Sequence, residues 1–192
     1  MSLIIPSNYR NKLLAETTEI AIKSIKDDFQ QRLIEALNLR RITAPMVVPR
    51  GSGLNDDLDG KQSPVSFAVN DADIEAEVVQ SLAKWKRVKL ATYGIAPGYG
   101  LYTDMNALRP AEHLDNLHSI YVDQWDWERT INDADRNVDY LTTTVRSIYA
   151  AIKGSEELVY KMFPHITPTL PDDIHIIHAQ EPVSYTHMTV PP

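Results

Sequence analysis

The side chains best suited to chemistry lie in one stretch, residues 101–129, which reads as a β-hairpin with a polar loop between its strands. Because side chains alternate between the two faces of a strand, Gln124, Asp126 and Glu128 share one face of the second strand. Arg109 stands where the first strand ends. Each polar group buried without a partner costs roughly 1–3 kcal/mol, so three in succession need a reason. The pattern predicts that an arginine, an amide and two carboxylates converge on one patch, which would suit a charged ligand.

Two strands must position these groups. The first is predicted to run to Leu108, and the second to start near Ser119. The opposite face of the second strand carries Trp125 and Trp127, which offer enough apolar area to anchor it against a core. The alternative is an edge strand with a solvated polar face, and the spacing alone leaves that alternative open.

Several motifs together resemble one enzyme family. The hairpin contains ALRP (107–110) and VDQWDWER (122–129), which resemble the ammonia-dependent asparagine synthetases, or aspartate–ammonia ligases. QSLAKWKR (80–87) is a near-match to the family's HSLAKWKR, and GLNDDLDG (53–60) is a looser match to its GTQDNLSG. The motifs keep the family's order and near-family spacing over roughly residues 8–181. The resemblance implies a fold similar to the catalytic core of class II aminoacyl-tRNA synthetases, in which the hairpin binds ATP through a phosphate-binding arginine.

The resemblance assigns the binding of L-aspartate to three residues. Lys86 would bind the α-carboxylate, Ala83 would contribute its backbone, and Asp126 would bind the α-ammonium group. From the residues alone, Lys86 and Lys89 both point within the apolar arc of a helix, where a lysine usually reaches water from the edge. We keep that interpretation for Lys89, whereas the resemblance favours substrate binding by Lys86.

Three residues would carry the chemistry that the resemblance implies. Asp56 matches a family aspartate that lies near the reacting carboxylate and the ammonia. Together, Asp56 and Gln124 would orient the reacting end of the substrate. Arg109 would bind ATP and stabilise the charge on its α-phosphate with fixed donors. On composition alone, loop 50–62 is more simply a solvated acidic turn, and its spacing does not fit an EF-hand calcium loop.

The implied reaction is the ATP-dependent amidation of L-aspartate by free ammonia, through a β-aspartyl adenylate, to L-asparagine, AMP and pyrophosphate. A carboxylate is a poor electrophile, so ATP must activate it, and Mg²⁺ would bridge phosphate oxygens. The chain has no cysteine, so it cannot release ammonia from glutamine with a cysteine nucleophile. Glu128 faces the same way as Gln124 and Asp126, and a metal or ribose contact is the hypothesis for it.

The histidines give no metal site. His175 and His178 have odd spacing, so in a strand they would face opposite ways and could not chelate one ion. A zinc site needs three or four ligands, and no others cluster nearby. His118 opens the second hairpin strand, where it could stack near adenine, although the sequence does not establish this.

Length and composition indicate a globular chain. Its 192 residues, 43% of them hydrophobic and 23% charged, suffice for one domain with a sizeable core. A net charge of −7 argues against nucleic acid as the main partner, although a local basic patch could survive. No apolar run approaches the ~20 residues of a membrane span, and the N-terminus does not read as a signal peptide. We therefore expect a cytoplasmic protein.

The expected fold is α+β, with a mixed, mostly antiparallel sheet flanked by helices. Helix 8–39 and strand 42–49, interrupted by Pro45, would form the dimer interface that the resemblance implies, so we expect a homodimer. Periodicity predicts these further elements: strand 64–69, helix 76–90, hairpin 101–129, helix 134–162 with a break near Gly154, and strand 174–181.

Apolar stripes on the first and last helices are predicted to face the core. The stripe of the first helix comprises Ile22, Ile25, Phe29, Leu33 and Leu37. The stripe of the last helix comprises Val138, Leu141, Val145, Ile148, Tyr149 and Ile152.

Residues 182–192 look foreign to the rest, with three prolines and no Asp, Glu, Lys or Arg. We expect the N-terminal portion of one synthetase-like domain over 1–181, followed by a non-native or disordered tail. The family pattern continues into a second half with another ATP-binding arginine, so the 192-residue chain itself is expected to be inactive. Two alternatives stay open: an aspartyl- or asparaginyl-tRNA synthetase core, and a non-catalytic synthetase-like binding or regulatory module.

Overall fold

The computed structural model describes residues 4–56, 58, 60 and 62–177, so His178 and the tail 182–192 lie outside the described residues. None of the helices in these ranges is both long and apolar enough to cross a membrane. The elements in chain order are α1 (Ala15–Leu37), β1 (Leu39–Arg41), β2 (Val47–Pro49), β3 (Ser66–Val69), β4 (Ile74–Val78), α2 (Ala83–Thr92), β5 (Gly100–Leu108), β6 (Tyr121–Arg129) and α3 (Val138–Met162).

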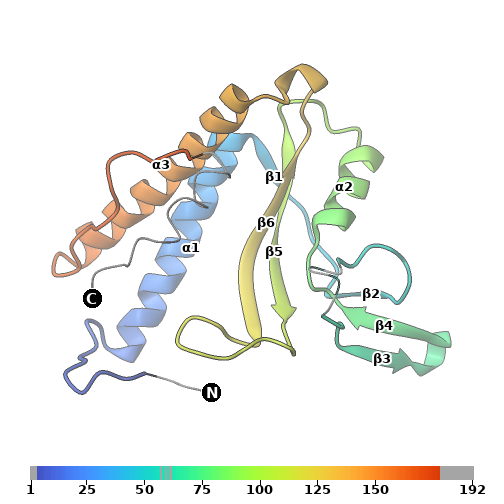
Figure 1. Cartoon of the computed structure of the whole chain (residues 1–192), viewed down its shortest axis with the longest axis horizontal. Coiled ribbons are helices and arrows are strands. Elements are labelled where there is room, and N and C mark those ends of the chain that lie inside the picture. The colour runs from blue at the N-terminus through green and yellow to red at the C-terminus, as the bar shows by residue number, and fades with distance from the viewer. Residues whose placement is uncertain (1–3, 57, 59, 61, 178–192) are drawn as a thin grey trace.

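β5 and β6 form the predicted hairpin at the centre of the molecule (Figure 1). They pair antiparallel over their whole length, from Gly100 opposite Arg129 to Leu108 opposite Tyr121. β1 joins β5 in parallel to give the order β1-β5-β6, and a second, antiparallel sheet has the order β2-β4-β3. The α+β class is confirmed, but the described strands form two sheets rather than the one mixed sheet predicted.

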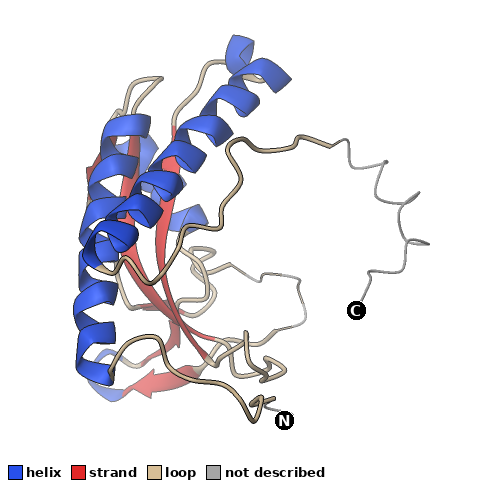
Figure 2. Cartoon of the chain, turned by 90° about the vertical axis from the view of Figure 1, so that its left-hand side faces the viewer, coloured by secondary structure: helices blue, strands red, loops and turns tan. Residues whose placement is uncertain are grey.

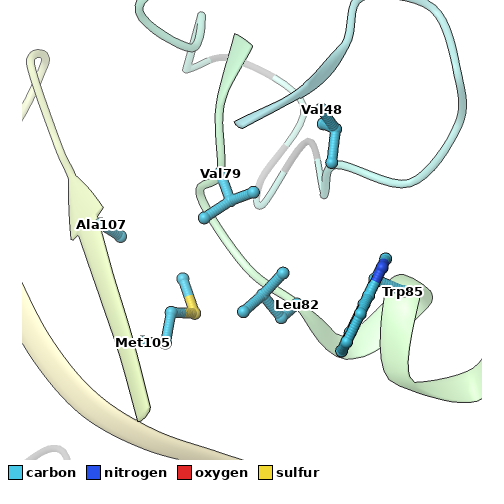
Figure 3. Packing of buried hydrophobic residues seen from close by; sticks show 6 residues of the cluster. All are labelled: Val48, Val79, Leu82, Trp85, Met105 and Ala107. Atoms are coloured by element: carbon cyan, nitrogen blue, oxygen red, sulfur yellow. The ribbon is translucent and has the colours of Figure 1, made fainter. Parts of the chain in front are cut away.

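The two faces of the hairpin pack against different helices. α1 and α3 lie along one face, and α2 lies by the other (Figures 1 and 2). Trp125 points to α1, where its ring centroid is 5.1 Å from that of Phe29. On the opposite face, Met105 and Ala107 of β5 point towards Val79 and Leu82 (Figure 3). The predicted anchoring of β6 by its aromatic face is therefore confirmed, and the polar face is the one turned to α2.

The predicted helix 76–90 is wrong at its start. Residues Ile74–Val78 form β4, and α2 begins only at Ala83. β4 pairs with β2 on one side and with β3 on the other, where Phe67 lies opposite Ala76. The segment forms backbone hydrogen bonds with a strand on each side, and its β-branched residues fit a pleated strand. These interactions outweigh the preference for a helix that the spacing of its apolar residues suggested.

The predicted break at Gly154 is also wrong, because α3 runs through it without interruption. A Cβ at Gly154 would collide with the guanidinium group of Arg32 on α1. That guanidinium donates from Nε to Asp28 Oδ2 at 2.7 Å, and Ser155 Oγ donates to the same oxygen at 2.8 Å. The glycine marks a close crossing of two helices rather than a helix end.

Much of the predicted core stripe of α3 is exposed. Val138 and Leu141 are 68% and 61% exposed, and Ile22 in the stripe of α1 is 45% exposed. α3 instead buries Ala151, Gly154 and Ser155 at its crossing with α1, while Ile148 packs partly against the core. Periodicity identified an apolar face correctly, but it could not show that the described part of the chain leaves much of that face uncovered.

Three predicted boundaries also differ. α1 begins at Ala15 rather than near residue 8. The predicted strand 42–49 is replaced by β1 and β2 on either side of a segment that includes Pro45, which lacks the N–H that a ladder needs. Residues 174–177, the described part of the predicted strand 174–181, pair with no strand in the described ranges, so His175 lies in an irregular segment.

Gly100 allows a test of how tightly β5 packs between β1 and β6. A Cβ there would collide with the backbone oxygen of Glu128 and lie 2.7 Å from Leu39 Cδ2. Gly100→Ala should therefore lower the free energy of unfolding by about 2 kcal/mol, measured by urea denaturation, because overpacking costs that much. Ser66→Ala, at an exposed position of β3, is the control and should stay within about 0.5 kcal/mol. Equal stabilities of the two variants would contradict the tight packing.

Candidate active site

A buried ion pair joins α2 to β6. Lys86 Nζ lies 2.5 Å from Asp126 Oδ1, and the exposed fractions of the two side chains are 0% and 16%. The other carboxylate oxygen accepts a hydrogen bond from the backbone N–H of Leu82, at 3.1 Å, where α2 begins. The structure therefore brings together the two side chains that the sequence assigned to the charged α-groups of aspartate.

The ammonium group of Lys86 has unused hydrogen-bonding capacity. It carries three donors, yet within the described residues it makes no hydrogen bond of ordinary geometry, despite its close ion pair. Burial lowers the pKa of Lys86 below its ordinary value, and the attraction of Asp126 opposes that shift only in part. Because a buried ammonium group is costly unless its donors are satisfied, an anionic ligand group would complete its surroundings.

The other predicted residues of β6 lie on the expected face. Gln124 pairs opposite Met105 of β5, and its Nε2 lies 3.4 Å from Met105 Sδ, a weak acceptor. Glu128 accepts from Arg87 Nη2 of α2 at 3.3 Å. This contact gives Glu128 a partner on the protein surface, and it lends no support to a metal or ribose contact. The alternation of side chains along β6 is confirmed, whereas the role of each residue stays a prediction.

Arg109 follows β5 and closes the base of the hairpin loop, where its backbone N–H donates to the Ile120 carbonyl at 2.7 Å. Its Nη1 atom is buried and has no hydrogen-bond partner in the described residues. A guanidinium group keeps its charge at any physiological pH and binds phosphate through parallel donors. The unpaired, buried Nη1 of Arg109 is therefore suited to bind a phosphate group of ATP.

The loop that Arg109 closes holds a local histidine–carboxylate contact. His118 Nδ1 lies 2.9 Å from Asp115 Oδ1, which also accepts from the backbone N–H groups of Leu117 and His118. These backbone hydrogen bonds, with the contact to His118, lower the pKa of Asp115 to about 2, and the carboxylate in turn raises the pKa of His118. The exposed His118 imidazole thus contacts Asp115 of the same loop through Nδ1. This contact does not indicate that the ring stacks on adenine.

Asp56 lies near Lys84 of α2, and the neighbouring Asn55 accepts a hydrogen bond from its backbone N–H. Lys84 Nζ is 3.9 Å from Asp56 Oδ1. Asn55 Oδ1 accepts from the backbone N–H of Asp56 at 3.1 Å and from that of Gln80 at 2.8 Å. The buried Asn55 therefore ties the predicted ammonia-side residue to the segment that leads into α2. No described hydrogen bond or ion pair joins Asp56 or Arg109 directly to the Lys86–Asp126 pair.

Sequence reasoning missed two residues of this region. Asn55 and Gln80 are both buried, with exposed fractions of 8% and 1%. The only available signal was that each stands inside a family-like motif, GLNDDLDG and QSLAKWKR, next to residues that were assigned roles. Ala83, which was assigned a backbone contact, opens α2, and its N–H donates to Ser81 Oγ at 3.2 Å.

Other parts of the described chain offer no competing site. No three His, Cys, Asp or Glu side chains gather there in a way that could hold a metal ion. A cavity of about 580 Å³ lies at the far end of β5, lined by Asn38, Tyr93 and Tyr99 among others. It contains none of the predicted site residues, and its size alone is no reason to place the chemistry there.

Comparison with known proteins agrees with the geometry. Residues 16–190 match the family model described as aspartate-ammonia ligase. The aspartate–ammonia ligase of Bacteroides thetaiotaomicron is 56% identical over 180 residues, which cover 93% of this chain and 52% of that protein. The Clostridium perfringens (strain SM101) enzyme of the same name is 51% identical over 93% of this chain and 54% of its own length. The chain thus spans about half the length of the curated relatives it matches.

Solved structures support the same fold at low sequence identity. An ATP phosphoribosyltransferase regulatory subunit/histidyl-tRNA synthetase from Bacillus halodurans has a TM-score of 0.55 and 14% identity, covering 79% of this chain and 38% of that one. The asparaginyl-tRNA synthetase of Entamoeba histolytica has a TM-score of 0.50 and 15% identity, over 82% of this chain and 33% of that one. These likenesses show a class II synthetase-like fold, and the family match is more specific: this chain belongs to the aspartate–ammonia ligase family.

Proposed function

We propose that this chain supplies the aspartate-binding side of an enzyme that makes L-asparagine from L-aspartate, free ammonia and ATP. The observation that carries the proposal is the buried Lys86–Asp126 pair, which presents one positive and one negative group side by side. A free α-amino acid carries the complementary pair, an α-carboxylate and an α-ammonium group. Lys86 would bind the first and Asp126 the second, as the sequence predicted.

The reaction would proceed in two displacements. An oxygen of the aspartate side-chain carboxylate attacks the α-phosphorus of ATP, the bond to pyrophosphate breaks, and a mixed anhydride with AMP forms. Ammonia then attacks the acyl carbon, the bond to AMP breaks, and the nitrogen loses a proton to give the amide. Arg109 would hold phosphate oxygens with its unpaired donor, while Asp56 and Gln124 would orient the reacting end of aspartate.

Mg²⁺ would accompany ATP as it does in phosphoryl chemistry generally. The described residues contain no cluster of three or more acidic or histidine side chains that could hold the ion, so we propose no protein ligand for it. We expect the reaction in the cytoplasm, where ATP and free amino acids are available.

We also propose that the active protein is a homodimer through α1. The support is the apolar surface that this helix leaves exposed, with Ile20 and Ile22 at 54% and 45%. The chain alone should be inactive, because about half of the relatives' length has no counterpart in it, and an adenylating site needs donors on both sides of the triphosphate.

Formation of asparagine tests the proposal. The purified chain, and the same chain extended with the remaining length of the Bacteroides thetaiotaomicron relative, are incubated with L-aspartate, ammonium and ATP–Mg²⁺. The extended protein should form asparagine and AMP in equal amounts and only with ammonium present, while the chain alone forms neither. Transfer of aspartate or asparagine to tRNA would favour the tRNA synthetase alternative. Binding of ATP and aspartate by a folded extended protein without turnover would favour the non-catalytic module.

A further inference from the structure

Gln80 is a buried amide with no partner. Its side chain is 1% exposed, and neither Nε2 nor Oε1 makes a hydrogen bond within the described residues. Buried side-chain atoms without a hydrogen bond of ordinary geometry occur in four residues of the described part of the chain: Gln62, Gln80, Arg109 and Lys86, whose Nζ is nevertheless ion-paired with Asp126. Two of these four are residues that the sequence assigned to substrate and ATP. Gln80 therefore shares with Lys86 and Arg109 a buried polar atom that lacks a hydrogen bond of ordinary geometry.

Gln80 also lies between the two sides of the candidate site. Its backbone N–H donates to Asn55 Oδ1 at 2.8 Å, and the same oxygen accepts from the N–H of Asp56 at 3.1 Å. Two residues later, the N–H of Leu82 donates to Asp126 at 3.1 Å. The segment 80–82 is thus hydrogen-bonded at one end to Asn55, the neighbour of Asp56, and at the other end to Asp126. Asp56 is expected at the reacting end of aspartate, and Asp126 at its α-ammonium group.

A ligand group is one partner that would satisfy an amide in this position. Leaving a buried donor or acceptor unpaired is costly, whereas an apolar side chain of similar shape would carry no such penalty. The Lys86–Asp126 pair is suited to the α-groups of aspartate, and the amide of Gln80 would add a donor to the side-chain carboxylate, whose orientation the proposed function gives to Asp56 and Gln124. A neutral N–H donor can orient that carboxylate through one oxygen without neutralising it, so the other oxygen keeps the negative charge that its attack requires.

We propose that Gln80 is a specificity-determining residue that donates from Nε2 to the side-chain carboxylate of L-aspartate. This inference rests on the proposed substrate, and it adds a residue that neither the charged pair nor Arg109 includes. It makes Gln80 the group that distinguishes L-aspartate from amino acids that share its α-groups but lack the second carboxylate.

Calorimetric titration of the full 192-residue chain tests the proposal with two ligands. L-Aspartate carries the side-chain carboxylate, and L-2-aminobutyrate has a methyl group in its place. Gln80→Met removes both donor and acceptor at similar length, and Gln80→His keeps one N–H donor. Gln31→Met is the matched control, because Gln31 is an exposed glutamine of α1 whose amide pairs with Glu35.

Gln80→Met should weaken the binding of L-aspartate roughly 10-fold, the loss expected for one hydrogen bond to a charged group, and leave L-2-aminobutyrate binding unchanged. Gln80→His should recover most of the loss, and Gln31→Met should change neither ligand. Without ligand, Gln80→Met should melt at the same temperature as the wild type or higher, because it removes an unpaired buried amide.

Three results would overturn the inference: equal weakening of both ligands, a lower melting temperature of unliganded Gln80→Met, or no preference of the wild type for L-aspartate over L-2-aminobutyrate. Failure of the proposed function looks different. In that case the wild type prefers L-aspartate and loses the preference in Gln80→Met, yet the extended protein forms no asparagine. The inference about Gln80 would then stand without the reaction.

Discussion

Lys86→Met is expected to weaken the binding of L-aspartate by roughly 100-fold, because it removes the cation that would hold the α-carboxylate in a fully buried position. The same change leaves Asp126 with the Leu82 N–H as its one remaining described partner. Truncating one member of a buried pair strands the other charge, so the free energy of unfolding should also fall, by about 3 kcal/mol. Calorimetry with L-aspartate and urea denaturation measure the two effects.

A second variant separates the two roles of this pair. Lys86→Met combined with Asp126→Leu removes both charges, so it should recover most of the lost stability, because a buried ion pair contributes little compared with apolar side chains of similar volume. It should not recover aspartate binding. Recovery of both properties together would show that the pair is purely structural, and it would remove the main support for the proposed function.

Lys89→Met is the matched control on the same helix. Lys89 Nζ lies 5.5 Å from the ring centroid of Trp85 and 5.7 Å from that of Tyr93, which agrees with a lysine that packs at the edge of the apolar arc. Its loss should cost about 0.5–1 kcal/mol of stability. Aspartate binding should stay unchanged, because no described contact joins Lys89 to the pair.

The dependence of binding on pH gives an independent check on Lys86. Only the protonated ammonium group attracts a carboxylate, and burial holds the pKa of Lys86 below the ordinary 10.5. The affinity for L-aspartate should therefore begin to fall on the alkaline side at a lower pH than an ordinary lysine would allow. In Lys86→Met, only the alkaline fall caused by deprotonation of the α-ammonium group of aspartate itself should remain in the residual binding.

Local pattern was enough to predict the hairpin and its two faces. The alternation along β6 depends only on strand geometry, and Trp125 and Gln124 lie on the faces that it assigned. A shift of the pairing by one residue would turn the tryptophans away from the core, so the observed register keeps the predicted faces. The family resemblance singled out Lys86 and Asp126, although their direct contact depends on how α2 packs on β6, which no local pattern contains.

Two of the wrong predictions share one physical cause, which is that the deciding partner lies far away in the sequence. Ile74–Val78 has helix-compatible spacing, but β2 and β3 provide ladders on both of its sides. Gly154 looks like a helix break until Arg32 of α1 is seen to occupy the space of a side chain. Gln80 shows the same limit at the site, because its missing partners become visible only when its surroundings are known.

Arg109→Met is expected to weaken ATP binding by roughly 100-fold, the upper range for loss of hydrogen bonds to a charged group. Fluorescence titration with ATP measures the effect. The stability of the unliganded chain should not fall, because Nη1 has no described partner to lose and its burial is a cost that methionine avoids. This combination, weaker binding with unchanged or higher stability, distinguishes a ligand-binding arginine from a structural one, whose removal would lower stability as well.

Arg109→Lys examines which property of the side chain matters. Lysine keeps the charge but replaces the planar fork with a single point, so it should restore only part of the affinity for ATP if the phosphate is held by parallel donors. Full restoration would mean that charge alone attracts the nucleotide to this end of β5. Arg40→Met, at an exposed arginine of β1, removes the same charge away from the hairpin loop and should leave ATP binding unchanged. If Arg40→Met and Arg109→Met weaken ATP binding equally, the effect is general electrostatics, and the assignment of a phosphate site to Arg109 fails.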